Sequence, residues 1–124
     1  MEARAVITIF DQIKAGVHEL VSSDVLVLEV MKNSDSVKRQ LVLDALKYAA
    51  EEYRMSERDR QRGKELEAML FQRFDASHIA CAEGARANAF LTTDDRLLGR
   101  ARKFQARLLV RVYDPIQWLG EVSS

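Results

Sequence analysis

Short strand-like runs alternate with longer helical segments along the whole chain, and this alternation limits the folds open to it. Apolar residues at helical spacing predict a first helix up to about Gly16. Later helices are expected at residues 24–31, 37–50, 56–70, 75–85 and 94–103, with a proline-started turn at 115–119. Strand-like runs stand at residues 17–21, 53–55, 89–92 and 108–113. This order favours an α/β fold with a mostly parallel sheet.

The chain is sized for one domain. It has 124 residues, of which 48% are hydrophobic, and its single proline is Pro115. We therefore expect one domain over residues 1–124 with a packed core. Lysine and arginine together number 19, as do aspartate and glutamate, so the bulk charge indicates no partner. Any binding of nucleic acid has to come from local separation of charge.

Cysteine usage and hydropathy bear on location. Cys81 is the only cysteine, so no internal disulfide can form, and we expect a small buried apolar side chain. The N-terminal residues lack the apolar segment of a signal peptide, and no apolar run is long enough to span a bilayer. These features predict a soluble, cytoplasmic protein without membrane contact.

Glu29 interrupts an apolar run that extends over residues 25–31. A carboxylate is costly to bury unless something pairs with it. Two interpretations are open. Glu29 either binds a metal ion or metal-bound water at a cleft, or it marks the solvated side of a helix.

Asp75, Asp94 and Asp95 stand at the expected starts of two helices. Asp75 opens a helix rich in small residues, and the other two acids follow the strand-like run at 89–92. Ligands of open α/β sheets bind at the carboxyl ends of strands, so these acids are candidate metal ligands. Each also suits an ordinary role, because acids at a helix N-terminus cap free N–H groups and complement the dipole.

Taken together, the acids indicate a metal site more strongly than each does alone. Mg²⁺ and Mn²⁺ prefer oxygen ligands, and neighbouring carboxylates repel one another unless a cation offsets their charge. Such a site can orient a water molecule and stabilise the charge that develops on a phosphodiester. The sequence contains no His/Cys spacing typical of zinc and no Gly-rich phosphate loop.

Basic residues crowd the C-terminal third of the chain: Arg96, Arg100, Arg102, Lys103, Arg107 and Arg111. They form either a track for a phosphate backbone or a solvated helix face. Thr92, Arg96 and Arg100 are the candidates nearest in sequence to Asp94 for contact with nucleic acid. The segment 57–67 mixes both signs of charge and is expected to be an ordinary solvated face.

Four segments resemble motifs of the PIN-domain family, in particular its VapC-like toxin ribonucleases. Residues 75–80, with the sequence DASHIA, resemble the D-A-x-H-I-A helix of that family, and residues 90–98 resemble its strand-to-helix T-x-D motif. The segment 20–26 followed by Glu29 resembles the part that carries a family glutamate. Residues 110–119 resemble the closing strand and turn. The resemblance covers nearly the whole chain.

The resemblance implies a three-layer α/β/α fold around a parallel sheet, and an acidic pocket that binds Mg²⁺ or Mn²⁺. It implies endonucleolytic cleavage of RNA by a metal-activated water. Glu29, Asp75 and Asp94 map to the catalytic, metal-binding acids of the family, with Asp95 as an additional metal ligand. It also implies a homodimer and a role as the toxin of a type II toxin–antitoxin system, with an antitoxin protein as partner.

The N-terminal segment departs from the family pattern. The family begins with a central strand ending in an L-D-T type sequence, whose aspartate binds the metal, and nothing here resembles it. Asp11 lies inside the expected first helix and is a poor substitute. We therefore expect an N-terminally incomplete PIN-like domain without its central first strand. Weak nuclease activity should follow, and unpaired edges and apolar surface should favour pairing with a second copy.

Two alternatives to a ribonuclease remain open. One is a catalytically impaired remnant of the same fold that acts as a protein-binding or oligomerisation module. The other is a helical interaction domain in which every acid is a helix cap. A metal titration separates the nuclease from both, and a lack of strands would favour the helical domain.

Overall fold

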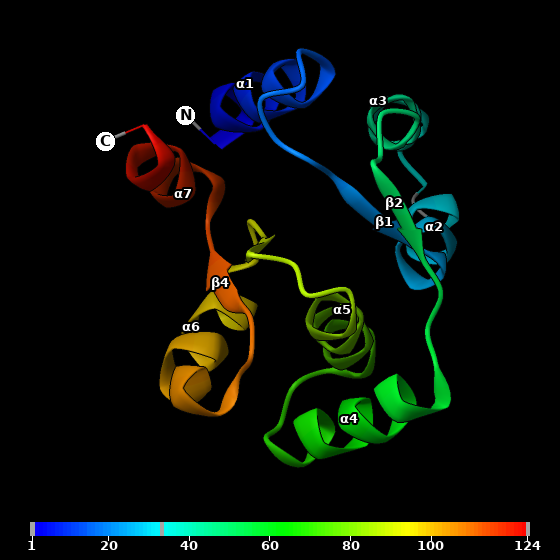
Figure 1. The fold of residues 1–124 in the computed structure, drawn as a ribbon, viewed down its shortest axis with the longest axis vertical. Coiled ribbons are helices and arrows are strands. Elements are labelled where there is room, and N and C mark those ends of the chain that lie inside the picture. Colours follow the sequence, from blue (N-terminus) through cyan, green and yellow to red (C-terminus); the bar gives the residue numbers. More distant parts are fainter. Residues whose placement is uncertain (1, 33, 124) are drawn as a thin grey trace.

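The computed structural model describes residues 2–32 and 34–123, apart from the side chains of residues 2, 3, 29 and 38. Helices and short strands alternate in a mixed α/β fold (Figure 1). The helices of this part of the chain are α1 (Glu2–Lys14), α2 (Asp24–Met31), α3 (Ser36–Leu46), α4 (Glu57–Ala68), α5 (Arg73–Gly84), α6 (Asp95–Phe104) and α7 (Pro115–Val122). The strands are β1 (Val21–Ser23), β2 (Glu51–Tyr53), β3 (Ala89–Leu91) and β4 (Arg111–Tyr113). None of these helices is long and apolar enough to cross a membrane.

The strands form two separate parallel pairs. β1 pairs with β2, with Ser22 opposite Glu52, and β3 pairs with β4, with Phe90 opposite Val112. The parallel pairing predicted from the sequence is therefore confirmed. The single sheet is not, because no strand among the described residues joins β1 to β3.

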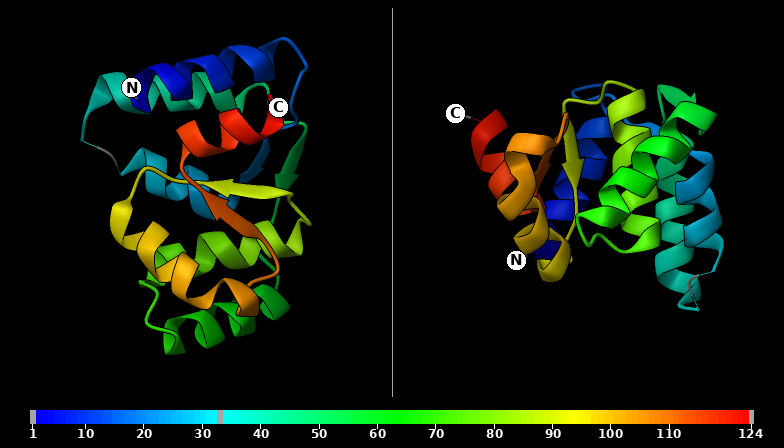
Figure 2. Two further views of the ribbon diagram at one scale, coloured as in Figure 1. Left: turned by 90° about the vertical axis from the view of Figure 1, so that its left-hand side faces the viewer. Right: turned by 90° about the horizontal axis from the view of Figure 1, so that it is seen from below.

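Helix α5 packs against both strand pairs. It contacts both β1 and β3, and it also packs against α4 and α2. On the other side of the strands, α1 contacts α7 and α3 (Figure 2). Helix α5 is therefore in contact with β1 and α2 from the first half of the chain and with β3 from the second half.

The main core lies where α4, α5 and α6 meet β4. Leu66 and Ile79 are its largest fully buried side chains. The small residues Ala76 and Ala80 of α5 are buried with them, so α5 approaches its neighbours closely. The small-residue helix expected from the sequence therefore serves packing. Cys81 is buried as predicted.

Side-chain caps fix where most helices begin. Ser56 and Asp59 form a capping box at the start of α4, a pairing that the S-x-x-D spacing of the sequence predicts. The sequence predicts a serine cap for α2 at Ser22 or Ser23, and Ser23 Oγ accepts from the Leu26 N–H at 3.0 Å. Asp114 caps α7, which has Pro115 in its first turn.

Several expected boundaries are wrong. The strand predicted at 17–21 lies at 21–23, because the ladder begins only where Leu20 accepts from Ala50. The helix predicted to reach Ala50 ends at Leu46, since the next three N–H groups bond to carbonyls only three residues back, in 3₁₀-type turns. The last strand begins at Arg111 instead of Leu108, after the 3₁₀ turn η1 (Gln105–Arg107). The sequence also predicts a turn at residues 33–36, and its first residue, Asn33, lies outside the described residues.

Candidate functional site

The loop from β3 to α6 holds Asp94 in a defined position. Asp94 is the N-cap of α6, and its Oδ1 accepts from the N–H groups of Arg96 at 2.9 Å and Leu97 at 3.3 Å. The Asp94 N–H donates in turn to Thr92 Oγ1 at 3.1 Å. The capping role left open by the sequence is therefore confirmed. Both bonds use Oδ1, so capping does not require the second carboxylate oxygen, and Asp94 is exposed.

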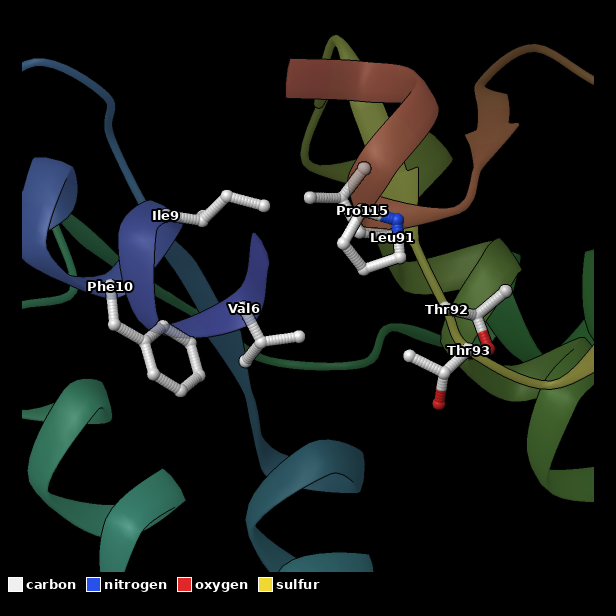
Figure 3. Close-up of a pocket in the computed structure, with 7 residues that line it drawn as sticks. All are labelled: Val6, Ile9, Phe10, Leu91, Thr92, Thr93 and Pro115. Carbon is white, nitrogen blue, oxygen red and sulfur yellow. The ribbon is translucent and has the colours of Figure 1, made fainter. Parts of the chain in front are cut away.

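A cavity of about 330 Å³ lies beside this loop. Figure 3 shows three apolar side chains of α1 facing the end of β3 across it: Val6, Ile9 and Phe10. Leu91, Thr92, Thr93 and Pro115 line the other side. Thr92, predicted to contact nucleic acid, therefore borders a cavity at the carboxyl end of a strand. The contribution of α1 was missed because its helical apolar spacing is equally typical of core packing.

The start of α5 lies at the same end of the molecule. Asp75 is in the first turn of α5 and is half-buried. The connection from α5 to β3 is short, and His78 lies 6.4 Å from Phe90 between ring centroids. The chain therefore turns back after α5, which puts the N-terminal end of α5 beside the carboxyl end of β3 (Figure 2). α5 begins two residues earlier than the sequence suggests, so Asp75 is within its first turn and Gln72 is the N-cap.

The end of α2 reaches the same region. Lys32 Nζ lies 5.0 Å from the ring centroid of Phe74, at the start of α5. Glu29 stands on α2 about one turn before Lys32. Helix α2 packs against α5. The side chain of Glu29 lies outside the described part of the structure.

Three chain segments that carry predicted site acids thus lie at one end of the fold. Asp95 is exposed in the first turn of α6, next to Asp94. Among the described side chains, no group of three or more His, Cys, Asp or Glu residues is placed to hold a metal ion. That search does not cover the side chain of Glu29. The segments that carry these acids share an end of the molecule, and the described side chains among them form no metal-binding group.

The predicted basic track has two members next to this end. Arg96 and Arg100 are one turn apart on α6 and therefore share a face of that helix. Arg96 is exposed and Arg100 is half-buried. The other four basic residues are exposed: Arg102, Lys103, Arg107 and Arg111.

A second polar cluster, which sequence reasoning missed, lies at the other end of α5. The Tyr53 hydroxyl donates to Asp59 Oδ2 at 2.6 Å, and this bond, together with burial, raises the pKa of Tyr53 to about 12. Burial raises the pKa of Asp59, but hydrogen bonds from Tyr53 and Ser56 outweigh it and leave the pKa below its usual value. Burial and the charge of Asp59 raise the pKa of Cys81 to about 12, so its thiol stays protonated and unreactive at neutral pH.

An ion pair fixes the same end of the helix to its surroundings. Arg62 Nε donates to Glu83 Oε1 at 2.7 Å, and the side chain of Glu83 is only 4% exposed. Glu83 Oε2 also accepts from the Leu109 N–H at 2.8 Å. Arg62 donates further to the carbonyl oxygen of Arg107 at 2.7 Å. These bonds connect α4, α5 and the segment that leads into β4.

Comparison of the chain with models of known protein families, with curated proteins and with solved structures found no match.

Proposed function

We propose that this protein is a Mg²⁺- or Mn²⁺-dependent endoribonuclease of PIN type. One observation carries the proposal: the end of α2, the start of α5 and the loop after β3 lie at one end of the fold, and each carries a predicted acid. Ligands of α/β proteins bind at the carboxyl ends of strands. The cavity beside Thr92 lies at such an end.

Glu29, Asp75 and Asp94 would hold the ion, with Asp95 as an additional oxygen donor. Their oxygen atoms suit Mg²⁺ or Mn²⁺ chemically. A bound ion would lower the pKa of a coordinated water and offset charge on the phosphodiester. We expect weak activity, because nothing in this sequence resembles the family strand whose aspartate binds the metal. Thr92, Arg96 and Arg100 would contact the RNA backbone beside Asp94.

The two strand pairs support the PIN-type assignment in a second way. A three-layer α/β/α fold with one parallel sheet requires a strand between β1 and β3. In the family that strand is the central first one. Helix α5 contacts both pairs, one at β1 and the other at β3. This arrangement is compatible with a sheet whose central strand is missing from the described residues.

Activity is tested by metal-dependent cleavage of single-stranded RNA by the full chain. Asp75→Asn and Asp94→Asn should each lower the cleavage rate by at least about 100-fold, because each removes a charged metal ligand. Asp11→Asn is the matched control, since Asp11 is an exposed carboxylate on α1 outside the site. Cleavage that persists in both site variants, or that does not depend on added metal, would contradict the proposal.

Exposed apolar side chains favour the alternative function, a protein-binding or oligomerisation module. Leu109 is 82% exposed, Val37 77% and Leu70 68%. Burial of such side chains against a second copy would stabilise a homodimer. Light scattering should show a dimer or larger assembly, and a stable monomer at high concentration would count against it.

The cellular role that goes with the proposal is that of a toxin in a type II toxin–antitoxin pair. RNA cleavage in the cell should stop growth when the chain is produced, and a cognate antitoxin protein should relieve the arrest. Asp94→Asn should abolish the arrest without lowering the amount of protein. Arrest that is equally strong with Asp94→Asn would separate toxicity from the acidic site.

A further inference from the structure

A groove of about 480 Å³ runs between α4 and α5. These two helices lie side by side (Figure 1). Its principal lining residues are Arg60, Gly63, Lys64 and Glu67 of α4 and Arg73 and Ser77 of α5. The four α4 residues recur at helical spacing, so they form one continuous face of that helix. The sequence predicted an ordinary solvated surface for this segment. Arg60, Lys64 and Glu67 are exposed as predicted, and they also form one wall of the groove.

Gly63 lies in the α4 wall of the groove. It is buried in the interior of α4, where glycine is among the least favourable residues. A Cβ atom at Gly63 would have nothing within 4 Å. Gly84 of α5 differs, because a Cβ atom there would collide with the hydroxyl of Tyr53. Packing therefore explains the glycine at position 84 but not the one at position 63, where, as at Gly99 and Gly120, a Cβ atom would enter open space.

The walls of the groove are basic. Arg60, Lys64 and Arg73 bring three cations against the single carboxylate of Glu67. Among the described residues, neither Lys64 nor Arg73 forms an ion pair. Within the described part of the chain, Arg60 pairs only with Glu57, at 3.7 Å and with both side chains exposed. An exposed pair of this kind contributes little to stability and is easily broken.

The neighbouring Arg62 shows the contrast on the same helix. Its guanidinium donates to Glu83, Glu65 and the carbonyl oxygen of Arg107, so its donors are committed within the protein. The groove cations carry no comparable set of bonds. Arginine and lysine side chains whose donors are not already bonded within the protein are suited to phosphate oxygens, which accept charge-assisted hydrogen bonds.

The groove also lies close to the proposed acidic site. Arg73 and Ser77 are four residues apart on α5 and share one face, while Asp75 lies between them on the opposite face. α5 begins at Arg73, so the positive end of its dipole is at the groove. An extended polyanion that crosses the start of α5 would contact the groove on one side and Asp75 on the other.

We propose that the α4–α5 groove binds phosphate groups of single-stranded RNA. The identity of the polymer rests on the proposed nuclease function, whereas the preference for phosphate rests on the groove itself. Lys64, Arg73 and Arg60 contact consecutive phosphates, Ser77 donates a hydroxyl, and Gly63 allows the strand to approach the helix backbone. The groove holds the RNA in position, and the acids near the N-terminal end of α5 take part in its cleavage.

Binding is measured by fluorescence anisotropy of a labelled single-stranded RNA, with a chelator present so that no metal is bound and no cleavage occurs. The double variant Lys64→Gln/Arg73→Gln should weaken binding by at least about tenfold. It should also lower the log–log salt slope by about 1.4, because each lost phosphate contact to a single strand accounts for about 0.7. Gly63→Leu should weaken binding similarly by filling the groove.

Arg58→Gln/Lys47→Gln is the matched control, since it removes two exposed cations outside the groove and should leave binding unchanged. Gly63→Ala, with little added bulk, should retain the fold and most of the binding. Circular dichroism confirms that each variant is folded.

Three results would overturn the proposal. One is wild-type binding that the double variant and Gly63→Leu leave unchanged. Another is absence of RNA binding by the wild type, and the third is equal binding of a polyglutamate peptide or of a mononucleotide in place of the RNA. Groove-dependent binding without any metal-dependent cleavage would instead leave this proposal standing and contradict the nuclease.

Discussion

The two ends of α5 use their polar side chains differently. At the C-terminal end, Glu83 is buried, and its two carboxylate oxygens are bonded to Arg62 and to the Leu109 N–H. At the N-terminal end, Asp75 is half-buried and Arg73 is exposed. Groups that hold elements together are enclosed and bonded on several sides, and groups that could meet a ligand remain accessible to solvent. The C-terminal end is therefore the structural end, and the N-terminal end is the candidate functional end.

The largest expected effect is the loss of Glu83. Glu83→Ala leaves Arg62 without its main partner and the Leu109 N–H without an acceptor. Since the Arg62 side chain is 22% exposed and can regain water, we expect a loss of about 2–3 kcal/mol in the free energy of unfolding. Urea denaturation measures this change in the free energy of unfolding. Glu65→Ala, which removes only an exposed partner of Arg62, should cost less than about 0.5 kcal/mol. Equal losses of stability in Glu83→Ala and Glu65→Ala would mean that the C-terminal end of α5 is not a distinct structural end.

The next effect tests how closely the structural end is packed. Gly84→Ala places a methyl group against the Tyr53 hydroxyl and the Asp59 carboxylate. These two groups bond to each other at 2.6 Å, so neither can move without breaking that bond. We expect a loss of about 2 kcal/mol in the free energy of unfolding, typical of overpacking. A variant as stable as the wild type would mean that Tyr53 has another position available.

The sequence predicted local structure better than global arrangement. The capping box at Ser56, the start of α2 and the Asp94 cap follow from short-range chemistry, in which a side-chain oxygen meets an N–H group two or three residues away. The division of the strands into two pairs depends on which distant segments meet. No local pattern in three-residue strands such as β1 and β3 specifies that choice.

The candidate site was predictable only as a set of positions. The residue types and their places after strands and at helix starts pointed to Asp75 and Asp94, and both lie at one end of the fold. Their mutual geometry depends on how α2 and α6 pack around α5, which the sequence does not show. Tyr53 and Gly84 were missed for a similar reason, since their contact joins β2 to the end of α5.

A smaller effect concerns pH. The bond to Asp59 and burial raise the pKa of Tyr53 from 10.0 to about 12, so the folded state disfavours tyrosinate. The stability this provides is fully present below pH 10 and is lost as the pH rises from 10 to 12. Tyr53→Phe should cost about 1–2 kcal/mol at neutral pH and should weaken the alkaline loss of stability. An unchanged alkaline profile of unfolding would show that Tyr53 does not titrate as expected.

Gly63→Ala should change stability in the opposite direction to Gly84→Ala. The new methyl group enters open space and replaces the less favourable helix residue, so we expect a gain of about 0.5–1 kcal/mol in the free energy of unfolding. Thermal denaturation of the two alanine variants side by side measures the difference. A loss of stability at position 63 would mean that the groove is already filled by neighbouring atoms.

The smallest expected effect on stability separates capping from metal binding at Asp94. Asparagine caps a helix about as well as aspartate, so Asp94→Asn should change the free energy of unfolding by less than about 0.5 kcal/mol, whereas Asp94→Ala should cost about 1 kcal/mol. A bound ion adds stability that grows with the ratio of its concentration to Kd. Mn²⁺ should therefore stabilise the wild type and neither variant. If Mn²⁺ stabilised Asp94→Asn as strongly as the wild type, Asp94 would be a helix cap alone. The candidate functional end of α5 would then lose its neighbouring acid on α6, whose position is well defined by hydrogen bonds.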